Sequence, residues 1–245
     1  MKKIITIAVA LLMAGTAFAQ QALWGSASTV SPEINEDGTV TFRYHAPKAV
    51  KVTVSGDFLP TQRLTFQMNG QEMTYDAPGV AELKEGQHGV WEYTTDFKVA
   101  SGMYTYTFNV DGNNVIDNNN MWVNRDIASL TSAFIVPGGR ADLYTIQDVP
   151  HRTVSKVWYE SATAGFDRRL SVYTPAGYEQ NRKQKYPVLY VLHGIGGDED
   201  AWLDQGRAAQ VLDNLIAQGK AQPMIVVFTN GNISQEAAPC ENSTG

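Results

Sequence analysis

The sequence predicts two consecutive folds: a β-sandwich of short strands, then an incomplete α/β domain with a mixed, mostly parallel sheet. Between residues 25 and 137, apolar and polar residues alternate with a period of two, which is typical of half-buried strands. After residue 150 the pattern becomes strand, helix, strand, as in a parallel βαβ unit. The 245 residues are 43% hydrophobic and 18% charged, so the composition is globular and the length suits two domains.

The first half contains short strands separated by turn residues. The alternation is clearest in residues 40–43, 50–54 and 104–108, where Val, Phe or Tyr alternates with Thr, Lys or Arg. Clusters of Asn, Asp and Gly separate such runs, at residues 35–38, 68–70 and 111–114. We therefore predict a sandwich over residues 25–137 and a linker over residues 138–150.

The second half, residues 151–245, carries the α/β pattern. Residues 156–159 and 168–173 predict two strands, and Pro187–Leu192 is a continuous apolar run that predicts a strand buried on both faces. Apolar residues then recur with helical spacing from Ala208 to Ile216, and Gly219 stands where a left-handed cap is expected. Residues 223–228 predict a second buried strand, which lies parallel to the first.

The first segment predicts a secretory signal peptide over residues 1–19. Lys2 and Lys3 precede an apolar run from Ile4 to Met13, and Ala17-Phe18-Ala19 supplies a cleavage pattern after Ala19. The run is too short to span a membrane. We expect a periplasmic or secreted protein that is free of the membrane once the signal is cleaved.

Charge and cysteine content exclude other classes. The net charge is −6 and no Lys/Arg cluster interrupts it, so a nucleic-acid partner is not expected. Cys240 is the only cysteine, which leaves no internal disulfide and no Cys/His zinc ligand set. We expect no metal and no cofactor.

The chemical signal is the glycine-rich bend that follows the first apolar run. His193-Gly194-Ile195-Gly196-Gly197 lets the backbone turn sharply and approach a ligand. Backbone N–H groups freed there can stabilise an oxyanion, and one such donor contributes about 2.7–4 kcal/mol to acyl transfer. A plain tight turn and a phosphate-binding loop are the alternatives.

The residues around this bend resemble the esterase-D-type branch of the α/β-hydrolases, and most closely carbohydrate esterase family one. The similarity covers residues 150 to 235, including Tyr186–Gly197, Trp202, Gly206-Arg207, Asp213–Ile216 and Pro223–Val227. It implies a serine nucleophile and esters on plant polysaccharide, as in feruloyl and acetyl-xylan esterases.

The resemblance also assigns roles to residues of the bend. It implies an oxyanion loop over His193–Gly197, with the backbone N–H of Ile195 as donor and Gly194 and Gly196 beside it. His193 belongs to the turn and is not the base. Trp202 is placed near the acyl pocket, although a core Trp is the alternative. We expect Asp198, Glu199 and Asp200 to form a solvated acidic turn.

The catalytic triad is missing from the sequence. In the hydrolase fold the serine lies in G-x-S-x-G, followed by Asp/Glu and then His. The chain contains no G-x-S-x-G and no His after His193. We expect the front part of an esterase that is inactive by itself.

The first half resembles early-set, immunoglobulin-like sandwiches related to glycogen-binding modules of family forty-eight. The similarity rests on Val52–Phe58, Gly89–Glu92 and Gly102–Gly112. Flat aromatic residues of those modules are replaced here, so a packing and positioning domain is favoured over glucan binding. Any sugar-binding residues remain unknown, with these aromatic candidates: Phe58, Trp91, Tyr93, Tyr104 and Trp122.

The favoured function is the leading part of a secreted serine esterase, whose partner is an acylated polysaccharide or oligosaccharide. One alternative is a non-catalytic carbohydrate-binding protein. Another is a different acyl enzyme of the same fold, such as a siderophore esterase or a mycolyl transferase.

Overall fold

The strands of the first half form two antiparallel sheets. The computed structural model describes residues 29–126, 129–181, 183–194 and 197–232, so the predicted signal peptide and Cys240 lie outside the described residues. One sheet has the order β1-β2-β8-β7, and the other has the order β11-β12-β9-β3-β6, with β10 also paired to β9. The first sheet consists of β1 (Glu33–Ile34), β2 (Val40–His45), β7 (Lys84–Glu85) and β8 (Val90–Thr94). The second consists of β3 (Val52–Gly56), β6 (Gly79–Glu82), β9 (Gly102–Val110), β10 (Asn113–Val115), β11 (Val123–Asp126) and β12 (Ser129–Val136).

The core of this half is aromatic. Phe42 of β2 stacks on Phe58 with ring centroids 4.6 Å apart and meets the edge of Tyr106 at 5.0 Å. The period-two prediction is correct at Val52 and Val54, which are fully buried. The prediction that Val50 is a half-buried strand residue is wrong. Its side chain is 86% exposed, and its backbone N–H donates to the carboxylate of Asp111 at 2.9 Å.

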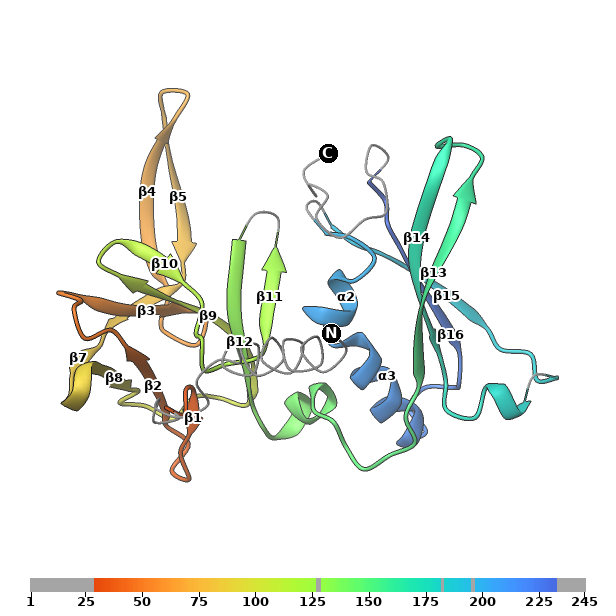
Figure 1. The fold of residues 1–245 in the computed structure, drawn as a ribbon, viewed down its shortest axis with the longest axis horizontal. Coiled ribbons are helices and arrows are strands. Elements are labelled where there is room, and N and C mark those ends of the chain that lie inside the picture. Colours follow the sequence, from red (N-terminus) through yellow and green to blue (C-terminus); the bar gives the residue numbers. More distant parts are fainter. Residues whose placement is uncertain (1–28, 127–128, 182, 195–196, 233–245) are drawn as a thin grey trace, which may run out of the picture.

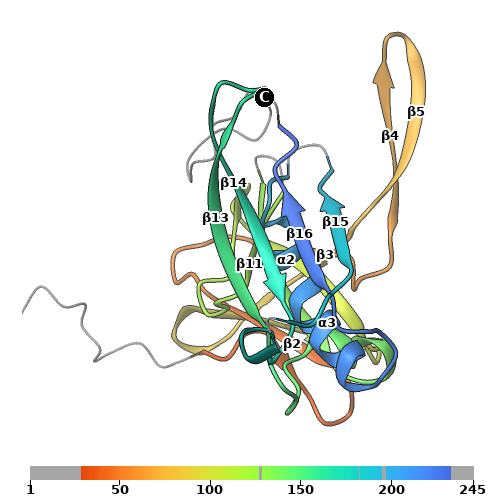
Figure 2. The ribbon, with the colours of Figure 1, turned by 90° about the vertical axis from the view of Figure 1, so that its right-hand side faces the viewer.

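A long hairpin extends from this half. Strands β4 (Gln62–Met68) and β5 (Gln71–Ala77) pair with each other in a sheet of their own, and they project from the sandwich in Figures 1 and 2. The predicted turn at residues 68–70 joins them, with Asn69 and Gly70 both at positive φ. A short 3-10 helix, η2 (Gln87–Gly89), precedes β8.

The predicted linker contains a 3-10 helix, η3 (Gly139–Tyr144), which packs against helix α3 (Ala208–Ala217). The amide of Asn214 on α3 donates to the carbonyl oxygens of Leu143 and Thr145 at 2.9 and 3.0 Å. The guanidinium of Arg207 lies 4.7 Å above the ring of Trp122. The two halves of the chain are therefore in direct contact through side chains of the α3 region.

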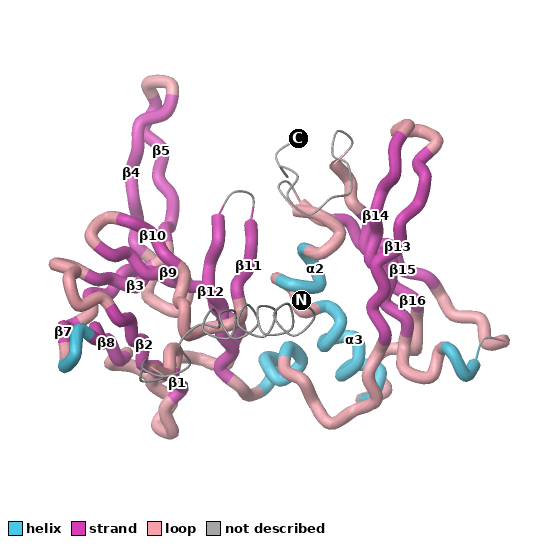
Figure 3. The backbone as a smooth tube through the Cα atoms, in the orientation of Figure 1, coloured by secondary structure: helices cyan, strands magenta, loops and turns pink. Residues whose placement is uncertain are grey.

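The second half is a four-stranded sheet in the order β13-β14-β16-β15 (Figure 2). Its strands are β13 (Thr153–Ser161), β14 (Phe166–Thr174), β15 (Val188–Leu192) and β16 (Ile225–Thr229). Two further short helices are η4 (Glu179–Asn181) and α2 (Ala201–Asp204), so strands dominate the described chain (Figure 3). The predicted βαβ unit is correct, because β15 and β16 are parallel on either side of α3.

Two predictions about this sheet need correction. The described sheet is mostly antiparallel, because β13–β14 is a hairpin and β14 runs antiparallel to β16. Strand β15 is not buried on both faces: it lies at the sheet edge, with Tyr190 63% and Leu192 67% exposed. Only Val191 of this strand packs with α3 in the small core around Tyr173, Val226 and Phe228.

The cap of α3 is as predicted. Gly219 has a φ of +66° and its N–H donates to the carbonyl of Ile216 at 3.0 Å, which satisfies the helix end.

Within the described residues, no helix has both the length and the apolar character needed to cross a membrane.

Candidate active site

The candidate site lies where β15 and β16 end. The two strands are parallel and in register, with Leu192 opposite Thr229. The segments that follow, beginning at His193 and Asn230, therefore leave the sheet at the same end, where both strands have their carboxyl termini. In α/β sheets the carboxyl ends of parallel strands are where ligands bind.

His193 ties the two segments together. The backbone N–H of Gly231 donates to Nε2 of His193 at 2.8 Å, and Nδ1 lies 2.6 Å from the carbonyl oxygen of Gly194. Because a backbone N–H can only donate, Nε2 is the acceptor and Nδ1 carries the proton. Both ring nitrogens are thus engaged within the loop, which leaves neither free to take a proton from a nucleophile.

The glycine bend is held at its far end by a second contact. Gly197 N–H donates to the carbonyl of Gly194 at 3.2 Å, and the amide of Asn232 donates to the carbonyl of Gly197 at 2.8 Å. A Cβ on Gly197 would lie 3.0 Å from the Cβ of His193, whereas one on Gly194 would meet nothing within 4 Å. Ile195 and Gly196 lie outside the described residues, so the assigned oxyanion donor stays a prediction.

Trp202 borders the bend from α2. Its indole Nε1 donates to the carbonyl of Leu192, the last residue of β15, at 2.8 Å. The side chain is 46% exposed, so Trp202 is not a core residue. A Cβ on Gly206 would lie 2.9 Å from the carbonyl oxygen of Trp202, which explains the glycine there.

The prediction of a solvated acidic turn at residues 198–200 is wrong. Glu199 is only 2% exposed, and its carboxylate pairs with the guanidinium of Arg169 on β14. Asp200 pairs with Lys156 and accepts a hydrogen bond from the Ser171 hydroxyl at 2.9 Å. The physical reason is that β13 and β14 place cationic side chains beside this turn, which sequence spacing alone does not reveal.

These charges change the titration of a neighbouring carboxyl group. Partial burial and the nearby carboxylate of Asp200 raise the pKa of Asp204, while the Lys156 ammonium opposes the shift. Tyr173, whose hydroxyl donates to Asp213 at 3.0 Å, also has a raised pKa because of burial and that carboxylate.

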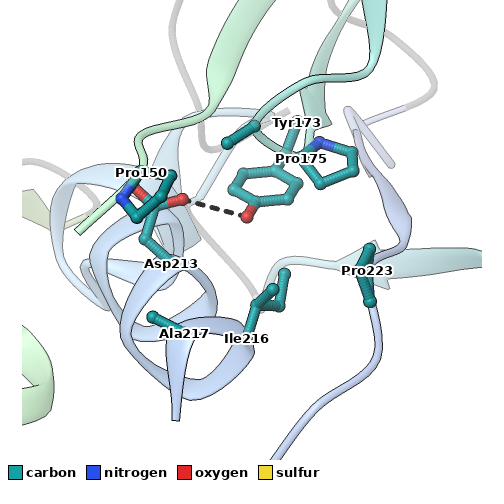
Figure 4. A pocket seen from close by; sticks show the side chains of 8 residues that line it. Pro150, Tyr173, Pro175, Asp213, Ile216, Ala217 and Pro223 are labelled. Carbon is teal, nitrogen blue, oxygen red and sulfur yellow. Dashed lines mark hydrogen bonds between the residues drawn. The ribbon is translucent and has the colours of Figure 1, made fainter. Parts of the chain in front are cut away.

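A cavity of about 210 Å³ lies at the opposite end of the sheet. Figure 4 shows its lining, with Pro150, Pro175 and Pro223 around the hydrogen bond between Tyr173 and Asp213. Pro223 precedes β16, so the cavity is at the amino ends of the parallel strands and away from the glycine bend. The Asp213 carboxylate is also held by Arg152 at 2.8 Å. The cavity therefore forms no part of the candidate site.

Among the described residues, no group of His, Cys, Asp and Glu is arranged to hold a metal ion. The aromatic candidates for sugar binding divide into two groups. Phe58 and Trp91 are each 6% exposed and belong to the core of the sandwich. Tyr104 stacks on Phe134 at 5.4 Å, Trp122 has the guanidinium of Arg207 over its ring, and Tyr93 packs against the core of the sandwich. All five side chains therefore have packing contacts within the protein.

Comparison with known proteins supports one class of chemistry. A family model described as putative esterase matches residues 161–244. An endo-1,4-beta-xylanase/feruloyl esterase of Xylanibacter ruminicola is 31% identical over 204 residues, which are 82% of this chain and 26% of that protein. An endo-1,4-beta-xylanase Y of Acetivibrio thermocellus is 34% identical over 73 residues, 28% of this chain and 7% of that protein.

The chain carries an esterase-like segment. The whole chain spans about a quarter or less of the length of the curated relatives that it matches. A crystal structure of the enterobactin esterase of Shigella flexneri is similar in fold, with a TM-score of 0.51 and 15% identity, over 79% of this chain and 52% of that one. This likeness extends beyond the esterase-like segment into the sandwich half.

Proposed function

We propose that this chain is the leading part of a secreted serine carboxylic-ester hydrolase that acts on acylated plant polysaccharide. The observation that carries the proposal is the glycine bend at the carboxyl end of β15, pinned by Gly231 and Asn232 inside the segment that matches esterases. The substrate class follows from relatives that are named xylanase and feruloyl esterase.

In this proposal the bend binds the oxygen of the ester carbonyl. A serine hydroxyl attacks the carbonyl carbon, the carbonyl electron pair moves to the oxygen, and backbone N–H groups stabilise the negative charge. Ile195 supplies one N–H donor, with Gly194 and Gly196 giving the backbone room to approach. Trp202, half-exposed beside the bend, contacts the acyl group.

The nucleophile, acid and base belong to a part of the protein beyond this chain. The sequence contains no G-x-S-x-G. Strand β15 also supports the proposal, because its outer edge pairs with no strand among the described residues, and the side chains of Val188, Tyr190 and Leu192 are exposed on the sheet surface. A further strand pairs with this edge in the longer protein.

The test is to assay the 245-residue chain and its longer reading frame on methyl ferulate and p-nitrophenyl acetate. We expect no serine-dependent turnover by the short chain and turnover by the longer one. Serine-dependent turnover by the short chain would refute its fragment status. A longer frame without G-x-S-x-G and without activity would refute the esterase.

Three other functions are tested alongside this one. The fold likeness to an enterobactin esterase makes a siderophore ester a second substrate to assay, beside the acyl transfer expected of a mycolyl transferase. A non-catalytic carbohydrate-binding protein would be retained on insoluble xylan or starch and inactive on every ester.

Residues 1–19 are proposed to direct export. Sequencing the N-terminus of the mature protein tests this proposal.

A further inference from the structure

The turn after the glycine bend contains a buried carboxylate that the proposed chemistry does not use. Glu199 is 2% exposed, and its two oxygens face different partners. One pairs with Nε of Arg169 and the other accepts from the amide of Asn230 at 3.2 Å. A charge taken out of water is tolerated only when it is paired and hydrogen-bonded in this way.

Arg169 is held from several sides. It projects from β14, its guanidinium lies 5.7 Å from the ring centroid of Trp158, and a second contact reaches Asp200 at 3.7 Å. Its side chain is 16% exposed. The partner of Glu199 is therefore a residue of the sheet, held by contacts to β13 and to the turn itself.

Asn230 passes this constraint to the next residues. Its side-chain oxygen accepts from the backbone N–H of Asn232 at 2.9 Å, and its carbonyl accepts from Arg168 at 2.6 Å. Gly231 and Asn232 then make the two contacts that hold the glycine bend, one to His193 and one to Gly197. Both ends of the bend are thus connected to Glu199 through one three-residue segment.

We propose that Glu199 is a positioning residue, which fixes residues 230–232 and through them the two ends of the glycine bend, His193 and Gly197. The role rests on the proposed function, since a positioned bend matters to catalysis only if it binds an oxyanion. Glu199 itself does not touch the substrate. Its effect is to keep the Gly231 N–H on His193 and the Asn232 amide on Gly197.

The experiment is 15N NMR of the 245-residue chain, which compares the Gly231 amide and the His193 ring nitrogens in Glu199→Gln and in wild type. The Gln side chain has the same size but turns an NH2 group toward Arg169 or Asn230. We expect the Gly231 amide to lose its bond to His193, so its exchange with solvent accelerates at least tenfold and the Nε2 resonance moves. Glu160→Gln, an exposed position on β13 of the same sheet, is the matched control and should change neither signal.

Unchanged His193 and Gly231 signals in Glu199→Gln would overturn the proposal. If that variant does not fold, Asn230→Ala tests the same connection, because it removes the relay and leaves the pair of Glu199 and Arg169 in place. Unchanged signals there would overturn it as well.

A second measurement separates this inference from the proposed function. In the longer protein, Glu199→Gln should lower kcat at least tenfold on methyl ferulate with KM within twofold, because the bend acts on the transition state. If the longer protein hydrolyses no ester while the NMR changes occur, the function fails and the positioning role stands. If wild type is active and the variant has unchanged kcat and NMR signals, the positioning role fails.

Discussion

Asn214 couples helix α3 to the linker segment that contains η3, and its truncation is the sharpest test of that coupling. The residue is 2% exposed, and its amide donates to the carbonyls of Leu143 and Thr145 at 2.9 and 3.0 Å, with Asp142 at 3.4 Å. In Asn214→Ala, two partly buried carbonyls lose their partner, each at about 1–2 kcal/mol, so we expect a loss of about 2–4 kcal/mol.

Proteolysis within residues 138–150 measures this loss. When opening is fast, cleavage follows the population of the open form, so the expected loss corresponds to cleavage roughly 30- to 900-fold faster. Gln218→Ala is the control, because Gln218 is exposed at the end of the same helix. A cleavage rate within about twofold of wild type in Asn214→Ala would show that η3 and α3 are held by something else.

Three further predictions concern the turn beside the glycine bend. Arg169→Leu leaves Glu199 buried without its cation, so urea denaturation should show the α/β half destabilised by about 3–5 kcal/mol; a loss below about 1 kcal/mol would contradict the pairing. The pKa of the Asp204 carboxyl is raised in the folded state, so its ionised form opposes folding above pH 3.8. Asp204→Asn should therefore be more stable than wild type at pH 7. This difference in stability should disappear as the pH falls below 3.8. Thermal melts at both pH values check the sign. Gly206→Ala places a Cβ 2.9 Å from the carbonyl of Trp202 and should cost about 1–3 kcal/mol and shift indole fluorescence, whereas an unchanged spectrum would contradict the close contact.

Local signals in the sequence predicted local structure well. Asn69-Gly70 predicted a tight turn because both residues tolerate positive φ, and both adopt it. Gly219 predicted the end of α3 for the same reason. The parallel pairing of β15 and β16 followed from the helix between them.

Features that depend on distant residues were not predictable in this way. The buried state of Glu199 depends on Arg169, thirty positions earlier in the chain and on another strand. The run Val188–Leu192 has the composition of a strand covered on both faces, yet most of its side chains are exposed. Likewise, nothing in the spacing of Asn214 indicates that its amide reaches three carbonyls of the preceding segment.

The central claim is that the bend at residues 193–197 stabilises an oxyanion, and removal of one backbone donor tests it most directly. Ile195→Pro eliminates the assigned N–H in the longer protein, while Ile195→Val retains it and serves as the control. We predict that kcat on methyl ferulate falls at least 100-fold in the proline variant, with KM nearly unchanged and the valine variant close to wild type. A proline variant that retains wild-type kcat would contradict the account.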